Sequence, residues 1–148
     1  MATPLTVKFK LQQGGILPLK AHQDDAGFDL FIPADVKLTD DPVVIDTKVC
    51  LEIPAGYFGM VTARSSASLR GIDVSVGIID SNYRGPIHIL ARRPKVSYDP
   101  AEYETVYAGQ SIAQLIIMPY ERNVVLSKEA TLTPSDRQDG RFGSSGGI

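Results

Sequence analysis

The sequence predicts an all-β protein of one domain, an antiparallel sandwich or barrel of short strands, on three observations. The chain has 148 residues, which is close to one ordinary domain and too short for two. Its 10 Pro and 13 Gly are spread along the chain, so few intervals reach the mean helix length of about 11–12 residues. The apolar residues form several short runs bounded by Gly or Pro, a pattern typical of sandwiches and barrels.

Four segments have the pattern of a strand: 48–53, 57–63, 87–90 and 112–118. In the first segment, Val49, Leu51 and Ile53 alternate with polar or small residues, which predicts a half-buried strand that ends at Pro54. The longest interval without Gly or Pro is 120–133, and its apolar residues lack the spacing of a helix face. The expected protein therefore has little or no helix.

The composition excludes several classes of function. A formal net charge of −2 at pH 7 excludes a protein that binds nucleic acid through bulk positive charge. No apolar run reaches the ~18 residues of a membrane span, and the N-terminus lacks a signal-peptide core. Cys50 is the only cysteine, which excludes an internal disulfide and a multi-cysteine zinc site. We therefore expect a soluble intracellular protein, in the cytoplasm or nucleus, with a cellular or viral source left open.

Polar patches stand at the edges of the apolar runs. The segment 24–30 places three aspartates around Gly27, and such acids can hold Mg²⁺ through its waters, although acids beside glycine are also ordinary turn residues. The segment 64–68 (RSSAS) follows a predicted strand. Its small residues can turn backbone N–H groups toward an anion beside Arg64, and a capped short helix that begins at Ser65 fits the same pattern.

The segment 77–85 (GIIDSNYRG) indicates a hairpin, because an acid ends one apolar run and Gly-Pro begins the next. In this turn Asp80 can orient and deprotonate a water, and Tyr83 can pack against a sugar or a base. Taken alone, each of these two is more often a structural turn residue. Gln114 lies inside an apolar strand, where it must face solvent or find a partner, since an unsatisfied buried amide costs about 1–3 kcal/mol.

The last residues of the chain combine positive charge, a phenyl ring and glycines. Arg137 is followed by GRFGSSG at 140–146. A frayed terminus has this composition. A lid has it too, because glycines can approach phosphates closely, Arg137 can bind negative charge and Phe142 can stack on a base.

Taken in order, these five patches resemble the five motifs of the homotrimeric dUTPase family. The matching segments are A-G-F-D-L (26–30), R-S-S-x-S (64–68), G-I-I-D-x-x-Y-R-G (77–85), I-A-Q-L-I (112–116) and F-G-S-S-G (142–146). Five motifs in the correct order are much more specific than any one of them. The resemblance implies a jelly-roll-like β domain at 1–136, a flexible Gly-rich arm at 137–148 that closes over the active site, and a homotrimer whose active sites are shared between subunits.

The resemblance also implies a reaction. In this family dUTP is cleaved to dUMP and pyrophosphate with Mg²⁺, which removes dUTP and supplies dUMP for thymidylate synthesis. By match to the motifs, Asp80 activates the water that attacks the α-phosphate, Tyr83 lies under the deoxyribose, and Asp29 orients waters on the metal. The other residues implied are Ser65 for catalysis and, for substrate binding, Arg64, Ser66, Ser75, Gly77, Gln114, Arg137, Phe142, Gly143 and Ser144.

Three segments depart from the family pattern. Arg141 stands where a glycine is usual, and 108–111 (AGQS) replaces a charged Gly-Asp-Arg sequence. The segment 92–107 is longer than the usual connection, so we expect a surface excursion there, with a protein partner left open.

Two other functions compete with hydrolysis of dUTP. A dCTP deaminase has a similar fold, but its catalytic glutamate would fall at Leu90, between Ile89 and Ala91, and none of these can move protons. A dUTPase-like scaffold that binds a protein or regulates a host process is favoured only by the length of 92–107. A capsid-type jelly roll would not need an arm that carries Arg137 and a phenyl ring.

Overall fold

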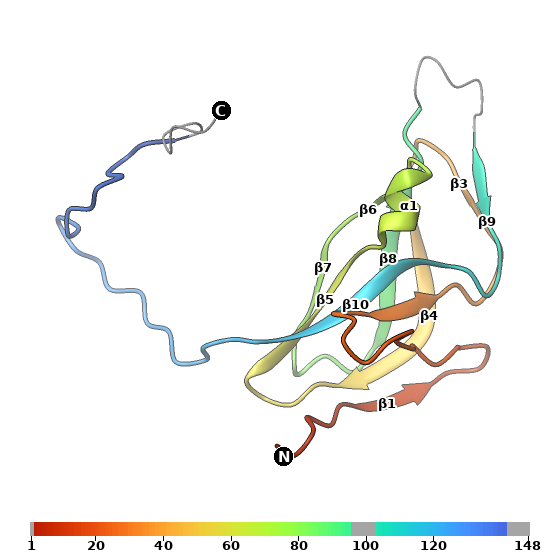
Figure 1. The fold of residues 1–148 in the computed structure, drawn as a ribbon, viewed down its shortest axis with the longest axis horizontal. Helices are drawn as coiled ribbons and strands as arrows, with labels where there is room; N and C mark the ends of the chain where they lie inside the picture. The colour runs from red at the N-terminus through yellow and green to blue at the C-terminus, as the bar shows by residue number, and fades with distance from the viewer. Residues whose placement is uncertain (1, 96–102, 142–148) are drawn as a thin grey trace.

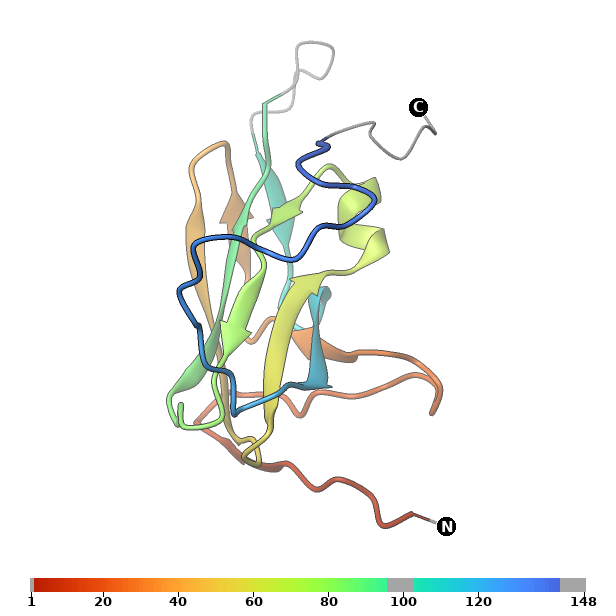
Figure 2. The same cartoon turned by 90° about the vertical axis from the view of Figure 1, so that its left-hand side faces the viewer.

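In the computed structural model, which describes residues 2–95 and 103–141, two four-stranded antiparallel sheets face each other across an apolar core (Figures 1 and 2). The elements are β1 (Lys8–Leu11), β2 (Phe28–Phe31), β3 (Val36–Leu38), β4 (Val43–Glu52), β5 (Tyr57–Ala63), α1 (Ser65–Leu69), β6 (Asp73–Val74), β7 (Gly77–Ile79), β8 (Pro86–Arg92), β9 (Glu104–Val106) and β10 (Ser111–Pro119). The all-β prediction is confirmed, as is each of the four expected strands. Within the described ranges, no helix is long and apolar enough to cross a membrane.

The first sheet has the strand order β1-β4-β8-β6, and the second has the order β2-β10-β5-β7. A short third sheet pairs β3 with β9. Because successive side chains point to opposite faces of a strand, each sheet presents alternate residues to the core. The largest fully buried side chains are Leu30, Ile32, Leu38, Thr47, Val49, Val61, Ile72, Ile87, Ile89, Val106 and Ile112.

Strand β4 begins before the predicted segment, because Ile45 and Thr47 continue the alternation of buried residues that includes Val49 and Leu51. Its register against β8 shifts between Asp46 and Cys50, and Lys48 has a φ of +63°, as in a β-bulge. The Lys48 backbone N–H donates to Asp46 at 2.8 Å, and this bond holds the pKa of Asp46 below its ordinary value. Thr47 is fully buried, and its hydroxyl donates to the Ile87 carbonyl at 2.7 Å, so a polar residue occupies the core without an unsatisfied group.

The hairpin expected at 77–85 is wrong in its strand pairing. β7 pairs with β5 in the second sheet, whereas β8 pairs with β4 and β6 in the first. The turn therefore carries the chain from one sheet to the other, closed by a bond from the Tyr83 N–H to the Asp80 carbonyl at 3.1 Å. Local residues signal the turn, but the partner of each strand is decided by distant segments.

The connection at 92–107 is only partly a surface excursion. Residues 96–102 lie outside the described part of the chain, but β9 follows them and pairs with β3 in the register Val36↔Val106. Val106 is fully buried. The end of this connection therefore belongs to the core, which the surface-excursion interpretation did not foresee.

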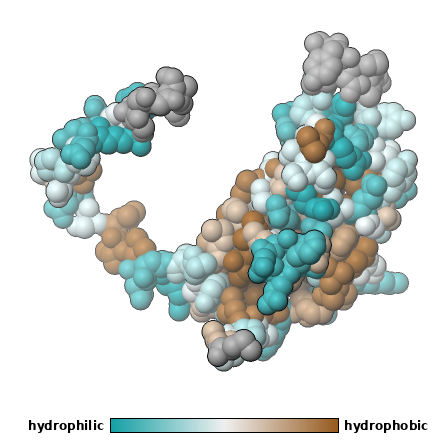
Figure 3. All heavy atoms as spheres, in the orientation of Figure 1, coloured by the Kyte–Doolittle hydropathy of each residue, from teal (hydrophilic) through white to brown (hydrophobic). Residues whose placement is uncertain are grey.

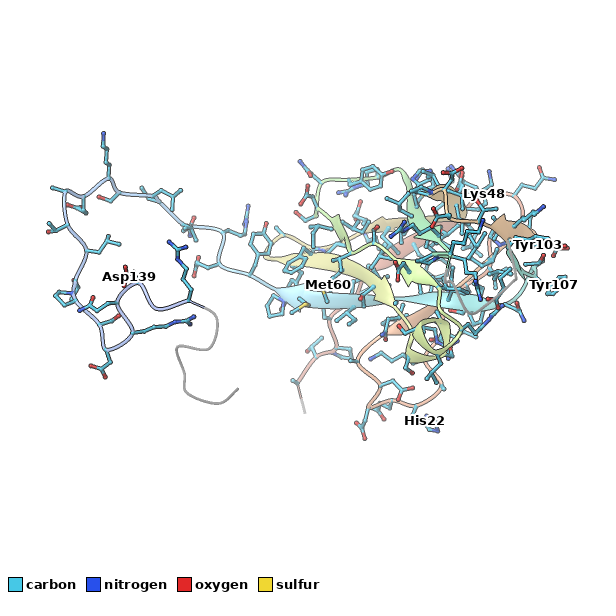
Figure 4. All side chains as sticks on the ribbon, turned by 90° about the horizontal axis from the view of Figure 1, so that it is seen from above. His22, Lys48, Met60, Tyr103, Tyr107 and Asp139 are labelled. Carbon is cyan, nitrogen blue, oxygen red and sulfur yellow. The ribbon has the colours of Figure 1, made fainter. Side chains whose placement is uncertain are left out.

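After β10 the chain leaves the body. Residues 120–141 contain no helix or strand, and Asp139 lies well apart from the sheets, on the opposite side from Tyr103 and Tyr107 (Figures 1 and 4). Val125 and Leu126 on this segment are 87% and 94% exposed. Neither side chain therefore packs against the body of its own chain. The expected domain boundary at 136/137 stays a prediction.

Candidate active site

Residues from two of the sequence patches and one further residue form a row across the second sheet. In the register of β10, Gln114 lies opposite Asp29 of β2 on one side and opposite Thr62 of β5 on the other. All three side chains are half-buried, and each stands next to a buried residue of its own strand. The row therefore lies on the outer face of the sheet, where polar groups can meet a ligand. Thr62 carries no signal in the sequence and is placed here by register alone.

Arg64 stands at the end of β5 and adds a positive charge to this row. Its Nε lies 3.0 Å from Asp29 Oδ1, and its Nη1 donates to the Ser111 carbonyl at 3.2 Å. A guanidinium has five N–H donors. These two contacts orient the side chain, which is 36% exposed, and leave it donors that can bind phosphate oxygens as a fork.

The short helix α1 begins directly after Arg64. It starts at Ser65, as the capped-helix alternative expects, but Arg64 occupies the N-cap position and no side chain caps the first turn. Ala67 is buried and anchors the helix, whereas Ser65 and Ser66 are exposed. Ser65 and Ser66 follow Arg64 directly in the chain, and their exposed hydroxyl groups remain open to an anion.

The Gln114 side chain has a hydrogen-bond partner, one of the two possibilities that its sequence position left open. Its Nε2 donates to the Ala63 carbonyl at 3.1 Å. The loop before β2 lies directly on the same amide, because a Cβ built on Gly27 would collide with Gln114 Oε1. Only glycine permits this approach. The segment 26–30 and Gln114 are thus locked together, a contact that sequence reasoning did not identify.

Asp80 lies far from this cluster within the same chain. The register of β7 against β5 pairs Gly59 with Ile79, so Asp80 stands near the opposite end of β5 from Arg64. At the strand rise of about 3.3 Å per residue, the separation is roughly 20 Å. One chain therefore does not bring Asp80 to Arg64.

Tyr83 and its neighbour Gly85 form a compact turn beside Asp80. The Tyr83 hydroxyl donates to the Pro86 carbonyl at 2.8 Å, and a Cβ on Gly85 would stand 2.5 Å from the Tyr83 oxygen. The ring thus lies against Gly85 with its orientation fixed. Tyr83 remains 40% exposed, and Asp80 is exposed next to it.

The other substrate-binding candidates fall in two further places. Ser75 lines a hollow with Ser68 of α1 and Leu90 of β8, and its N–H donates to the Leu90 carbonyl at 2.9 Å. Gly77 follows at the start of β7. Arg137 lies on the arm, where its Nε donates to the Gly140 carbonyl at 2.8 Å. The remaining candidates Phe142, Gly143 and Ser144 lie outside the described residues.

Comparisons with known proteins show the family of the chain. The family model of dUTPase matches residues 13–146. The chain belongs to the dUTPase family. Curated relatives include the deoxyuridine 5'-triphosphate nucleotidohydrolases of Mycobacterium avium (strain 104), which is 38% identical, and of Mycobacterium tuberculosis (strain ATCC 25177 / H37Ra), which is 37% identical. Each alignment covers 99% of this chain and 97% of the relative.

Solved structures of phage dUTPases share the fold. The Staphylococcus bacteriophage 80alpha dUTPase with dUPNHPP has a TM-score of 0.85 and 27% identity, covering 97% of this chain and 99% of the other. The dUTPase of phage phi11 of S. aureus has a TM-score of 0.77 and 25% identity, covering 85% and 97%. The chain is thus a dUTP nucleotidohydrolase, an enzyme of nucleotide metabolism, with the β-sandwich of its family.

Replacing Gly27 tests the contact that locks the loop to Gln114. Gly27→Ala forces its Cβ against the Gln114 amide, and such overpacking costs about 1–3 kcal/mol, so we expect a lower Tm and a higher KM for dUTP. Gly77→Ala is the matched control for the Tm alone, because its Cβ would meet only Val61 at an ordinary 3.8 Å. The Tm penalty of Gly27→Ala should shrink in a Gln114→Ala background, which removes the amide but keeps the Cβ 3.0 Å away, and an equal penalty in both backgrounds would refute the contact with the amide.

Proposed function

We propose that the protein hydrolyses dUTP to dUMP and pyrophosphate in a Mg²⁺-dependent reaction, in which a water activated by Asp80 attacks the α-phosphate. The observation that carries this proposal is the convergence of Asp29, Arg64 and Gln114 on one outer row, apart from the turn of Asp80 and Tyr83. A triphosphate and a nucleoside are chemically different halves of one substrate, and each half finds matching groups. The reaction removes dUTP and supplies dUMP for thymidylate synthesis.

The phosphate half of the site uses Arg64, Ser65, Ser66 and Gln114. Phosphoryl transfer needs positioning and charge neutralisation more than covalent chemistry. Arg64 would supply a positive fork, and the two exposed serines that follow it would supply hydroxyl donors. The Gln114 amide, oriented by its bond to the Ala63 carbonyl, would add its second N–H as a neutral donor.

Asp29 is the residue that would hold Mg²⁺ through water. The described residues contain no group of three or more His, Cys, Asp or Glu side chains that could enclose a metal ion. Mg²⁺ keeps several waters and is commonly held by one or two carboxylates together with substrate phosphates, so a single carboxylate beside Arg64 fits it. When bound, the ion would neutralise charge on the phosphates. A mutant of the phage phi11 dUTPase is described as coordinating a structural Mg(II) ion.

The nucleoside half of the site is formed by 75–83. Asp80 is an exposed carboxylate that follows β7 and can accept a proton from water. Tyr83, fixed by Pro86 and Gly85, would offer a flat ring to the deoxyribose and leave no room for a 2′-hydroxyl. The backbone between Ser75 and Gly77 would bind the uracil edge, rejecting cytosine by its donor pattern and thymine by its methyl group.

We propose that the protein is a homotrimer whose active sites are shared between subunits. The separation of roughly 20 Å between Arg64 and Asp80, at the strand rise, leaves each chain with two incomplete half-sites. The outer face of the second sheet is apolar beyond the polar row. Hydrophobic residues are also visible on the body and on the arm in Figure 3. The apolar residues of this face include Phe58, Met60, Ile78, Ile116 and Met118.

The arm completes the proposed site. Val125 and Leu126 of the segment 120–141 are exposed, and this segment runs away from its own body (Figure 1), so it is suited to reach another subunit. Arg137 would bind the outer phosphate, and Phe142, Gly143 and Ser144 would close over the uracil and phosphates. Closure excludes water from the reacting atoms.

A protein partner at 92–107 is a second proposal. The 80alpha dUTPases, to which this chain is similar, are described as controlling transfer of virulence genes by a proto-oncogenic G protein-like mechanism. The presence of Asp80, Tyr83 and Arg137 favours hydrolysis as the main function, with any such contact added to it.

Pyrophosphate release is the direct test of the reaction. We expect Mg²⁺-dependent release from dUTP and none from dCTP, dTTP or UTP, because the uracil edge and the Tyr83 ring exclude the other three. EDTA should abolish the release from dUTP. Pyrophosphate release from UTP at a similar rate would contradict the role of Tyr83. If the folded protein released no pyrophosphate from any of the four nucleotides, the proposed reaction would be wrong.

Asp80→Asn separates chemistry from binding. The amide keeps the shape of the side chain but cannot act as a base, so we expect kcat to fall by about 10²–10⁴-fold with dUTP affinity retained. Asp41→Asn is the control, since Asp41 is exposed and lies in the connection between β3 and β4. Normal turnover by Asp80→Asn in single-turnover kinetics would remove Asp80 from the mechanism.

Mixed trimers test whether sites are shared. Asp80→Asn subunits and Arg64→Ala subunits should each be inactive alone. Coexpressed in equal amounts, they should regain about a quarter of wild-type activity. If one chain supplies Asp80 and a neighbouring chain supplies Arg64, random assembly gives about one site in four in which both residues are intact. If each site lay within one chain, every site would carry a defect and the mixture would stay inactive.

A further inference from the structure

We propose that Arg70 and Glu104 form a positioning pair for the phosphate half of the site, although neither residue touches the substrate. The pair would hold the end of helix α1 against strand β9 and thereby fix Ser65 and Ser66 at the other end of the helix. This inference rests on the phosphate role proposed above for residues 64–66.

The contact between Arg70 and Glu104 joins segments far apart in the sequence. Arg70 Nε lies 2.5 Å from Glu104 Oε1, and Arg70 Nη2 donates to the Thr105 carbonyl at 3.4 Å. Both side chains are only about a third exposed or less, at 34% and 26%. Such a two-point contact of a guanidinium with a carboxylate and a carbonyl fixes its direction, which an exposed single-point pair does not.

Glu104 also faces a second arginine. Its Oε2 lies 3.6 Å from Arg93 Nε, and the Arg93 side chain is only 11% exposed. The Arg93 backbone N–H donates to the Thr39 carbonyl at 2.7 Å. One carboxylate therefore lies between two cations, one directly after β8 and one directly after α1. Removing its charge would leave both cations close together in a half-buried place, which is costly.

Helix α1 is too short to hold its own position. It has five residues, and isolated helices of this length are unstable in water. One apolar side chain, Ala67, is buried, and Leu69 is 89% exposed. Arg70 closes the helix through bonds from its N–H to the Ser66 and Ala67 carbonyls. The side chain of Arg70 therefore ties the closing residue of the helix to β9, and the position of Ser66 follows from it.

The geometry predicts a selective effect. A small shift of α1 moves Ser65 and Ser66 but leaves Asp80 in place, since Asp80 stands near the opposite end of β5. Loss of the pair should thus weaken binding of the β- and γ-phosphates. It should leave binding of the nucleoside and its first phosphate unchanged.

The test compares two ligands on three variants of the full chain. Arg70→Gln, Glu104→Gln and the double variant are titrated with the non-hydrolysable analogue dUpNHpp and with dUMP. We expect Kd for dUpNHpp to rise at least about tenfold in each single variant, within the roughly 10²-fold that small misplacements can cost in rate. Kd for dUMP should stay within about twofold. Glu104→Gln should be the more severe of the two, because Glu104 contacts Arg93 as well as Arg70.

Further controls separate positioning from stability. Lys8→Met removes an exposed ion pair with Glu52, 3.3 Å long, and should change neither Kd. Arg70→Lys keeps the charge and should recover part of the affinity. In the double variant, the losses should be far less than additive if the two residues act through one contact.

The outcomes distinguish the inference from the proposed function. An equal rise in Kd for dUpNHpp and dUMP, or a lower Tm with both Kd values unchanged, would overturn the positioning role. Neither result would contradict the proposed reaction. Wild-type protein that releases no pyrophosphate from dUTP would overturn the proposed function first. Additive losses in the double variant would show that Arg70 and Glu104 act separately, which also contradicts the proposal.

Discussion

The hydrogen-bonded register of β10 is the constraint on which the site depends. β10 lies between β2 and β5, and its pairing sets Gln114 beside Asp29 on one side and Thr62 on the other. A slip of one residue would turn every side chain of the strand to the other face. Gln114 would then enter the core and Leu115 would face solvent, so the same apolar burial that stabilises the sheet also fixes the polar row.

The same sheet keeps Arg64 and Asp80 apart within one chain. Arg64 follows one end of β5, and β7, whose last residue precedes Asp80, pairs toward the other end. A strand is stiff over its length, so these groups cannot approach each other within a subunit. The arm leaves the body after Pro119 with Val125 and Leu126 exposed. Both features make sense when the functional unit contains several copies.

Sequence reasoning found those features whose signals are local. The alternation at Val49, Leu51 and Ile53 predicted a strand, and the order of the five motifs identified the candidate residues of the site. It missed the pairing partners of β7 and β8, because a turn sequence does not encode which distant strand each arm joins. It also missed the buried position of Thr47, because the partner of its hydroxyl is the carbonyl of Ile87, forty residues along the chain.

By itself, the sequence determined the fold class, the family and the chemical groups available, because apolar periodicity, turn residues and motif order are all properties of short segments. Only the tertiary structure decided which groups share one location. It joined Gly27 to Gln114 and Arg70 to Glu104, and it separated Arg64 from Asp80. These relations arise from long-range strand pairing and from core packing, whose partners lie tens of residues apart and leave no trace in the local pattern.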